Sequence, residues 1–135
     1  MTQRQLICVG DVMSKTVHFV DGVDTVRNAL KMMKSVRTEA LIVNKRNEDD
    51  EYGILLLADI ARQVLARDRS SERVNVYEIM FKPVISVDSS MDIRYCARLF
   101  SRFRIYLAPV TDNSEIVGMV SYNNLVLRGC ELARL

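Results

Sequence analysis

The sequence predicts an α/β protein of the α+β type, built from two tandem β-α-β-β-α repeats related by a pseudo-twofold axis. Two observations predict this fold class. The chain matches itself at an offset of 67 residues, and both copies pass through the same order of apolar patterns. A unit with so few helices cannot cover its own small mixed sheet, so two units are expected to pack together.

The internal repeat is visible when Asp11–Val43 is laid over Glu78–Val110. Beyond this stretch the first copy has two extra residues, and Gly53 then matches Gly118 at an offset of 65. We therefore place the first repeat at 1–67, a linker at 68–74 and the second repeat at 75–135. The eight identical positions are Met13/Met80, Lys15/Lys82, Val17/Val84, Val20/Val87, Asp21/Asp88, Arg27/Arg94, Arg37/Arg104 and Val43/Val110.

The first half of each repeat predicts a short helical turn, a brief strand and a longer helix. The helical turns are expected at 9–13 and 74–80, and the strands at 16–20 and 83–87. A polar turn follows each strand. Apolar residues then recur at i, i+3, i+4 and i+7, the spacing of an amphipathic helix. These positions are Val26, Ala29, Leu30 and Met33 in the first copy, and Ile93, Cys96, Ala97 and Phe100 in the second.

The second half of each repeat predicts a β-hairpin and a closing helix. Strands are expected at 39–44 and 52–57, and again at 106–112 and 116–121. Polar residues between each pair of strands indicate the hairpin turn. We interpret the acidic stretch 48–51 as a solvated hairpin tip. The closing helices are expected at 58–68 and 122–135.

Composition narrows the class of protein. The net charge of +2 gives no support for a nucleic-acid partner, and the longest apolar run, Ile54–Ala58, is too short for a membrane span. Three scattered cysteines and one histidine have no metal-ligand spacing, and no nucleophile–base pair can be assembled. We therefore expect a cytoplasmic protein without a membrane segment, a metal or enzymatic activity.

The motifs of the two copies resemble a tandem pair of CBS (cystathionine-β-synthase) domains. In the first copy they read DVM, VDTVRNALKMM and GILLLADI, and in the second EIM, PVISV, LAPVTD and GMVSYNNL. The resemblance runs from about Gly10 to Leu127. It implies a stand-alone regulatory module that requires no cofactor. Such a module forms a homodimer, binds AMP, ADP, ATP or S-adenosylmethionine in clefts between the repeats, and signals to a regulated protein partner.

The resemblance also implies the site residues. The family's closing turn carries a Ser or Thr for ribose or phosphate and, three residues later, an Asp for the ribose hydroxyls. The first copy keeps Asp59 but has Leu56 at the hydroxyl position, whereas the second keeps Ser121 but has Asn124 at the acid position. Residues expected to frame the adenine are Thr16, Val17, Ala40, Leu41, Pro83, Val84, Leu107, Ala108 and Pro109, and the candidate phosphate contacts are Arg37 and Arg104.

These two departures from the family's closing turn predict that the two clefts prefer different parts of a nucleotide. A carboxylate accepts from two ribose hydroxyls at once, whereas an amide offers one oxygen, so the exchange costs about 1–3 kcal/mol. We expect the Asp59 cleft to favour ribose and the Ser121 cleft to favour phosphate. Ser-x-x-Asn and an early Asp also fit plain helix caps. The alternative is therefore a ligand-free dimerisation or interaction scaffold.

Overall fold

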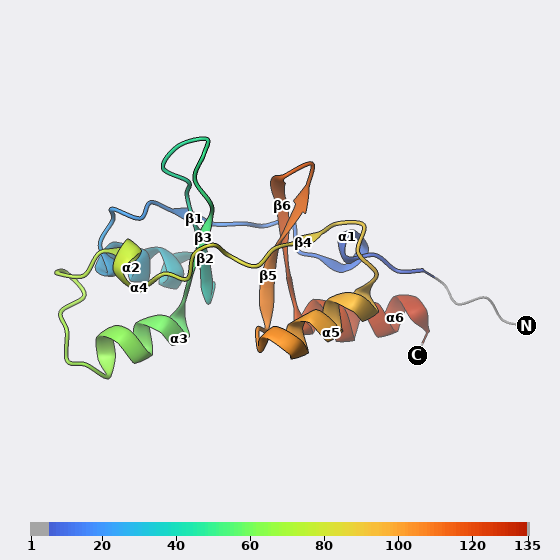
Figure 1. Ribbon diagram of the computed structural model, residues 1–135. Coiled ribbons are helices and arrows are strands. Elements are labelled where there is room, and N and C mark those ends of the chain that lie inside the picture. The colour runs from blue at the N-terminus through green and yellow to red at the C-terminus, as the bar shows by residue number, and fades with distance from the viewer. Residues whose placement is uncertain (1–5, 135) are drawn as a thin grey trace, which may run out of the picture. The chain divides into compact units, whose positions relative to one another are not determined.

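The structure is a computed structural model that describes residues 6–134, and it divides into two compact units (Figure 1). Unit 2 is the continuous stretch His18–Val84. Unit 1 combines the described parts of Met1–Val17 and Ile85–Leu135. Each unit holds one three-stranded mixed sheet packed with helices, so the predicted fold class is confirmed.

The sheet of unit 2 has the strand order β1-β2-β3. Strand β1 is parallel to β2, and β2 is antiparallel to β3. The core packs Val26, Ala29 and Met33 against Leu41 and Leu55, as the helical spacing predicts. The elements are β1 (Phe19–Val20), α2 (Val26–Val36), β2 (Ala40–Val43), β3 (Gly53–Leu56), α3 (Leu57–Ile60), the π-helical turn η1 (Ala61–Leu65) and α4 (Val76–Ile79).

Unit 1 repeats this arrangement with the strand order β4-β5-β6. Its core contains Cys96 and Phe100 of the long helix and Val110 and Val120 of the hairpin. The elements are α1 (Val9–Val12), β4 (Val87–Asp88), α5 (Ile93–Phe103), β5 (Leu107–Asp112), β6 (Glu115–Ser121), η2 (Asn124–Arg128) and α6 (Gly129–Ala133).

The two long helices begin and end in the same way. Thr25 Oγ1 accepts from the Asn28 N–H (3.1 Å), and Asp92 Oδ1 accepts from the Arg94 N–H (2.8 Å), which satisfies a free donor in each first turn. At the other end Arg37 and Arg104 both adopt left-handed backbone, with φ of 54° and 55°. Their N–H groups donate to the carbonyls of the last turn and so end the helices.

The leading segments are residues 9–17 of the first repeat and 74–84 of the second. Each packs in the unit that contains most of the other repeat. Val9 and Val12 of α1 join the core of unit 1, and Val74 and Val76 join the core of unit 2. The compact units therefore cross the repeat boundaries seen in the sequence. The crossing also explains why β1 and β4 are two residues long, shorter than expected. The predicted strand 16–20 spans the unit boundary after Val17, so only its end joins the sheet of unit 2.

No helix within residues 6–134 is long and apolar enough to cross a membrane.

Candidate functional site

The closing turn of unit 2 presents Asp59 in the first turn of α3. Its Oδ2 accepts from the Leu56 N–H (3.1 Å), and its Oδ1 accepts from the Arg62 guanidinium (2.8 Å). The carboxylate is 14% exposed, whereas the Arg62 side chain is 66% exposed. Asp59 thus caps the first turn of α3. Its ion pair with the exposed Arg62 side chain contributes little to stability.

The closing turn of unit 1 contains the reciprocal contacts of a helix cap. Asn124 Oδ1 accepts from both the Ser121 N–H (2.9 Å) and the Ser121 hydroxyl (3.0 Å). Ser121 Oγ in turn accepts from the Asn124 N–H (3.2 Å). The capping interpretation of Ser-x-x-Asn therefore describes real contacts. The two donors of the Asn124 side-chain amide have no hydrogen-bond partner in the described part of the chain, and the residue is half-buried.

Each closing turn lies at the same sheet edge as the end of the long helix in its unit. In unit 2, Ala40 pairs with Leu56, and the Leu57 N–H donates to the Glu39 carbonyl (3.0 Å). Arg37 precedes this pair by three residues and Asp59 follows it by three, so both lie at this edge.

Unit 1 has the same geometry. Leu107 pairs with Ser121, and the Tyr122 N–H donates to the Tyr106 carbonyl (3.1 Å). Arg104 precedes this pair and Asn124 follows it at the same spacing. Both arginines predicted to contact phosphate are exposed.

The leading segments run along the outer edge of each hairpin. Phe81 and Ile54 exchange two backbone hydrogen bonds of 2.9 Å, and the Val84 N–H donates to the Tyr52 carbonyl (2.9 Å). In unit 1, Ser14 and Met119 exchange two bonds of 2.8 Å.

The predicted site residues divide between the two units. Unit 2 holds Arg37, Ala40, Leu41, Asp59, Pro83 and Val84, and unit 1 holds Thr16, Val17, Arg104, Leu107, Ala108, Pro109, Ser121 and Asn124.

The framing residues differ in what they can offer a ligand. The side chains of Leu41 and Ala108 are fully buried in the two cores, so only their backbone atoms could contact a ligand. Thr16 and Pro83 are exposed, and Val84 is half-buried. Among the framing residues, the exposed ones therefore lie in the leading segments.

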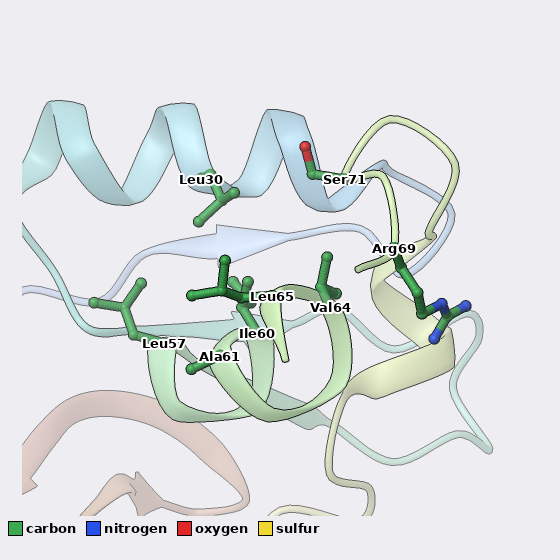
Figure 2. A pocket seen from close by; sticks show the side chains of 8 residues that line it. All are labelled: Leu30, Leu57, Ile60, Ala61, Val64, Leu65, Arg69 and Ser71. Atoms are coloured by element: carbon green, nitrogen blue, oxygen red, sulfur yellow. The ribbon is translucent and has the colours of Figure 1, made fainter. Parts of the chain in front are cut away.

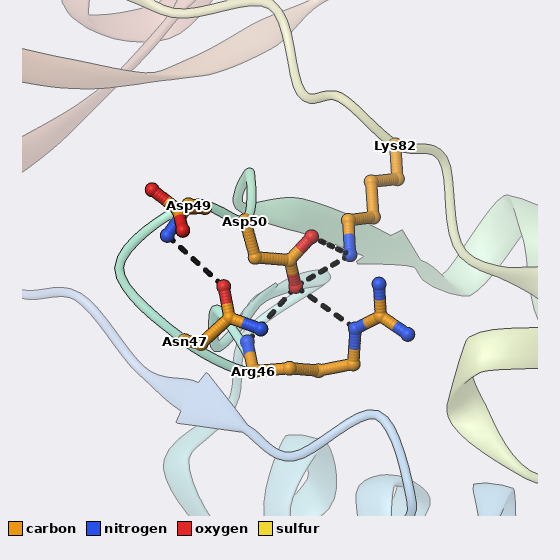
Figure 3. Close-up of polar contacts among 5 residues, drawn as sticks. All are labelled: Arg46, Asn47, Asp49, Asp50 and Lys82. Atoms are coloured by element: carbon orange, nitrogen blue, oxygen red, sulfur yellow. Dashed lines mark hydrogen bonds and ion pairs between the residues drawn. The ribbon is translucent and has the colours of Figure 1, made fainter.

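Sequence analysis missed one polar cluster in unit 2 (Figure 3). Asp50 lies in the stretch expected to be a solvated hairpin tip, yet its side chain is only 8% exposed and forms an ion pair with Lys82 (2.6 Å). That expectation is wrong for Asp50, because the longer hairpin of the first copy folds back onto the leading segment. Two signals could have revealed the pair: the two-residue insertion, and the lysine present in both copies as Lys15 and Lys82.

Unit 2 also contains an apolar groove of about 450 Å³ (Figure 2). Leu30 projects from α2 toward Ile60 and Leu65 of the closing helical segment. None of the predicted site residues lines this groove, and the Arg69 guanidinium at its end is paired with Glu78 (3.1 Å). The groove is therefore separate from the candidate site. Its lining is Leu30, Leu57, Ile60, Ala61, Val64, Leu65, Arg69 and Ser71.

Within residues 6–134 no three His, Cys, Asp or Glu side chains gather closely enough to hold a metal ion. Cys96 is buried in the core of unit 1, and burial raises the pKa of its thiol to about 11. Cys96 is therefore a small core residue and not a nucleophile.

Comparison with known families identifies the two repeats. The profile of the CBS domain matches residues 9–66 and 76–128. The chain belongs to the CBS domain family. Both matched stretches correspond to the internal repeats, so the resemblance inferred from the motifs is confirmed.

Individual CBS proteins match across most of the chain. A hexameric CBS-CP12 protein from bloom-forming cyanobacteria is 33% identical with a TM-score of 0.90, covering 94% of this chain and 70% of that one. The mitochondrial CBS domain-containing protein CBSX3 of Arabidopsis thaliana is 30% identical over 128 residues, covering 87% of this chain and 62% of the relative. The chain spans about three fifths of that relative and of a Methanopyrus kandleri protein, MK0525.

The CBS domain pair of protein MJ0100 has the same fold. Its TM-score is 0.79 at 24% identity, and the match covers 94% of this chain and 99% of that one. Its structure was determined in complex with 5′-methylthioadenosine and S-adenosyl-L-methionine.

Proposed function

We propose that this chain is a non-catalytic regulatory module that binds an adenosine-containing ligand, namely AMP, ADP, ATP or S-adenosylmethionine. One observation carries the proposal. Each unit brings together, around one hairpin, a polar closing turn, an arginine at the end of a long helix and a leading segment with an exposed residue, Thr16 or Pro83. The MJ0100 CBS pair, which has the same fold, accommodates two adenosine compounds.

The ribose is proposed to bind at Asp59 in unit 2. Asp59 Oδ2 stays on the Leu56 N–H and keeps α3 capped, while the exposed Arg62 side chain leaves Oδ1. The freed oxygen accepts from a ribose hydroxyl. A charge-assisted bond of this kind is stronger than a neutral one, and an exposed ion pair costs little to break.

Unit 1 is proposed to bind a phosphate-bearing ligand better than a bare nucleoside. Asn124 already uses its side-chain oxygen on Ser121, so it has no second acceptor ready for ribose. Its amide N–H groups are donors, which suit phosphate oxygens. Arg104 lies at the same sheet edge and adds a cation suited to bidentate contact.

Ligand binding would regulate a partner through a change in population. A ligand shifts two arrangements of the protein only by its differential affinity for them. We propose that the chain acts as a homodimer in the cytoplasm and presents one of two surfaces to a regulated protein. Apolar side chains that could be buried by self-association are exposed on the closing helices. They are Leu57, Leu65, Val126 and Leu127.

An enzymatic role has little support. The match to a homoserine O-acetyltransferase of Methanococcus vannielii covers 87% of this chain but only 24% of that protein. The CBS-like portion is thus a minor part of that enzyme.

A scaffold without ligand is the second candidate. The observation favouring it is that side-chain oxygens of Asp59, Ser121 and Asn124 are already engaged in capping contacts. In this alternative the turns only begin helices, and the module acts through dimerisation or partner binding.

Calorimetric titration of nucleotide-stripped protein with AMP, ADP, ATP and S-adenosylmethionine distinguishes the two candidates. Asp59→Asn is the informative variant, because it keeps an acceptor for the Leu56 N–H but removes the charge. Asn124→Asp is the matched gain-of-charge variant in unit 1.

We expect saturable binding that Asp59→Asn weakens by roughly one to two decades. At unit 1, Asn124→Asp should strengthen binding of S-adenosylmethionine, which has no phosphate, and weaken binding of AMP, ADP and ATP, because it gains an acceptor for ribose and loses the amide donors proposed for phosphate. If Asp59→Asn leaves the affinity unchanged and Asn124→Asp changes it, the principal site is in unit 1. Flat titrations with all four ligands would support the scaffold.

A further inference from the structure

The two units hold their leading segments in different ways. In unit 2, Lys82 stands between two backbone anchors, because Phe81 pairs with Ile54 and the Val84 N–H donates to Tyr52. The Lys82 ammonium reaches Asp50 Oδ1 at 2.6 Å and Oδ2 at 2.7 Å. The segment that carries Pro83 is therefore fixed by its backbone on both sides and by a charged contact in the middle.

The Asp50–Lys82 pair is shielded from water. The two side chains are 8% and 22% exposed, whereas Arg46, the other cation on Asp50, is 78% exposed. The Arg46 N–H donates to Asp50 Oδ2 (2.9 Å) and anchors the carboxylate from within the hairpin (Figure 3). Exposed ion pairs contribute little, but a shielded pair with additional hydrogen bonds resists separation.

Unit 1 lacks this contact. Lys15 occupies the place of Lys82 in the repeat, yet it is exposed and forms no ion pair within the described residues. The cause is the shorter hairpin. Strands β5 and β6 pair up to Asp112 and Glu115, and the turn between them is closed by Asn113 and Ser114, both at positive φ. No loop is left over to fold back onto the leading segment.

We propose that the Asp50–Lys82 pair is a positioning device that preorganises the unit 2 site, so that unit 2 binds adenosine ligands before unit 1 does. This inference rests on the function proposed above. A leading segment that is already in place adds no ordering cost to binding, whereas one that must be ordered lowers apparent affinity by its competent fraction.

Three single variants test the proposal: Lys82→Met and Asp50→Asn break the pair, and Lys15→Met is the matched control in unit 1. The first measurement is amide hydrogen exchange of the ligand-free protein. We expect the amides of Phe81 and Val84 to exchange faster in both pair-breaking variants and to be unchanged in Lys15→Met. Unchanged exchange in the pair-breaking variants would overturn the positioning role.

The second measurement is calorimetric titration with adenosine and with ATP. Adenosine has no phosphate, so Lys82 cannot act on it by charge attraction. We expect both pair-breaking variants to weaken adenosine binding at the Asp59-dependent site about fivefold or more, and Lys15→Met to leave it unchanged. Lys82→Arg, which keeps the cation, should retain most of the affinity.

The outcomes separate this inference from the proposed function. If the wild-type protein binds neither of these probes and none of AMP, ADP and S-adenosylmethionine, the proposed function fails and no site exists to be preorganised. If the wild-type protein binds and Asp50→Asn binds adenosine equally well, the preorganisation inference alone fails. If only ATP binding falls in Lys82→Met, Lys82 is a phosphate contact and the positioning role is overturned.

Discussion

Gly118 is the first residue of the GMVSYNNL motif in unit 1. Substituting it tests how closely residues 13–14 of the leading segment pack against β6. A Cβ at this position would lie 2.5 Å from the Ser14 carbonyl oxygen and 2.7 Å from Met13 Sδ. A carbon–oxygen contact normally needs about 3.3 Å. The obstacle is backbone, so Gly118→Ala must push residues 13–14 off β6.

The equivalent Gly53 of unit 2 is the matched control. A Cβ there would lie 3.0 Å from Met80 Sδ and 3.3 Å from the Phe81 carbonyl oxygen. A flexible thioether can move aside, so Gly53→Ala meets only a mild contact. The two substitutions have the same chemistry at matching repeat positions and differ in what surrounds them.

The expected magnitudes follow from general values. Overpacking costs about 1–3 kcal/mol, with Gly118→Ala at the upper end, and reduced freedom of the unfolded chain returns about 0.4–1 kcal/mol. The net destabilisation is about 2 kcal/mol for Gly118→Ala and close to zero for Gly53→Ala. At about 2.1 cal/mol/K per residue, 135 residues give roughly 3.5 °C per kcal/mol.

Thermal melting and urea denaturation of both variants measure this difference. The melting temperature of Gly118→Ala should fall by about 7 °C while that of Gly53→Ala stays near the wild type. A Gly118→Ala protein as stable as the wild type, or a larger loss for Gly53→Ala, would refute the close approach of residue 14 to β6.

Four further measurements test other parts of the structure. Lys82, with further hydrogen bonds from Arg46, holds the pKa of Asp50 well below its usual range. Its contribution to stability is therefore present above the unfolded pKa of about 4 and is lost as the pH falls below it, so Asp50→Asn should flatten the acid denaturation profile. An unchanged profile would contradict the pair. A thiol reagent at pH 8 should modify Cys96 only after unfolding, because burial raises its pKa to about 11; modification at the rate of a free thiol in the native protein would contradict its burial. Arg37→Gly should raise the free energy of unfolding by about 1 kcal/mol by removing a left-handed non-glycine residue, and a loss of stability in urea would show that the Arg37 side chain has a structural role. The fragment 18–84 should show cooperative unfolding by circular dichroism, whereas 85–135 should not, because its core lacks Val9 and Val12; a folded 85–135 would contradict the role of the leading segment.

Much of the fold could be predicted because its signals are local. The spacing of Val26, Ala29 and Met33 defines a buried helix face without reference to the rest of the chain. The hairpins follow from paired apolar runs around a polar turn, and Ser-x-x-Asn marks a helix start that the structure contains.

The partner sheet of each leading segment could not be predicted. The apolar residues at 9–13 suit either of two sheets with nearly the same pattern, and only tertiary packing selects between them. Asp50 and Lys82 are likewise 32 residues apart, so no local pattern joins them. For the candidate site, the sequence predicts the polar residues of each closing turn, but not which leading segment lies beside which hairpin. The sequence does not distinguish a helix cap from a ligand site, because both roles use the same side-chain oxygens of Asp59, Ser121 and Asn124.

The crossing of the leading segments has a consequence for synthesis on the ribosome. Val9 and Val12 pack on strands that end about 110 residues later, whereas the segments of unit 2 lie within His18–Val84. At about 5–20 residues per second, the first apolar turn waits roughly 6–20 s for its own sheet. Unit 2 can complete its core while unit 1 still lacks one. During that interval the nascent chain exposes this apolar turn while a sheet of nearly the same design, that of unit 2, is already complete.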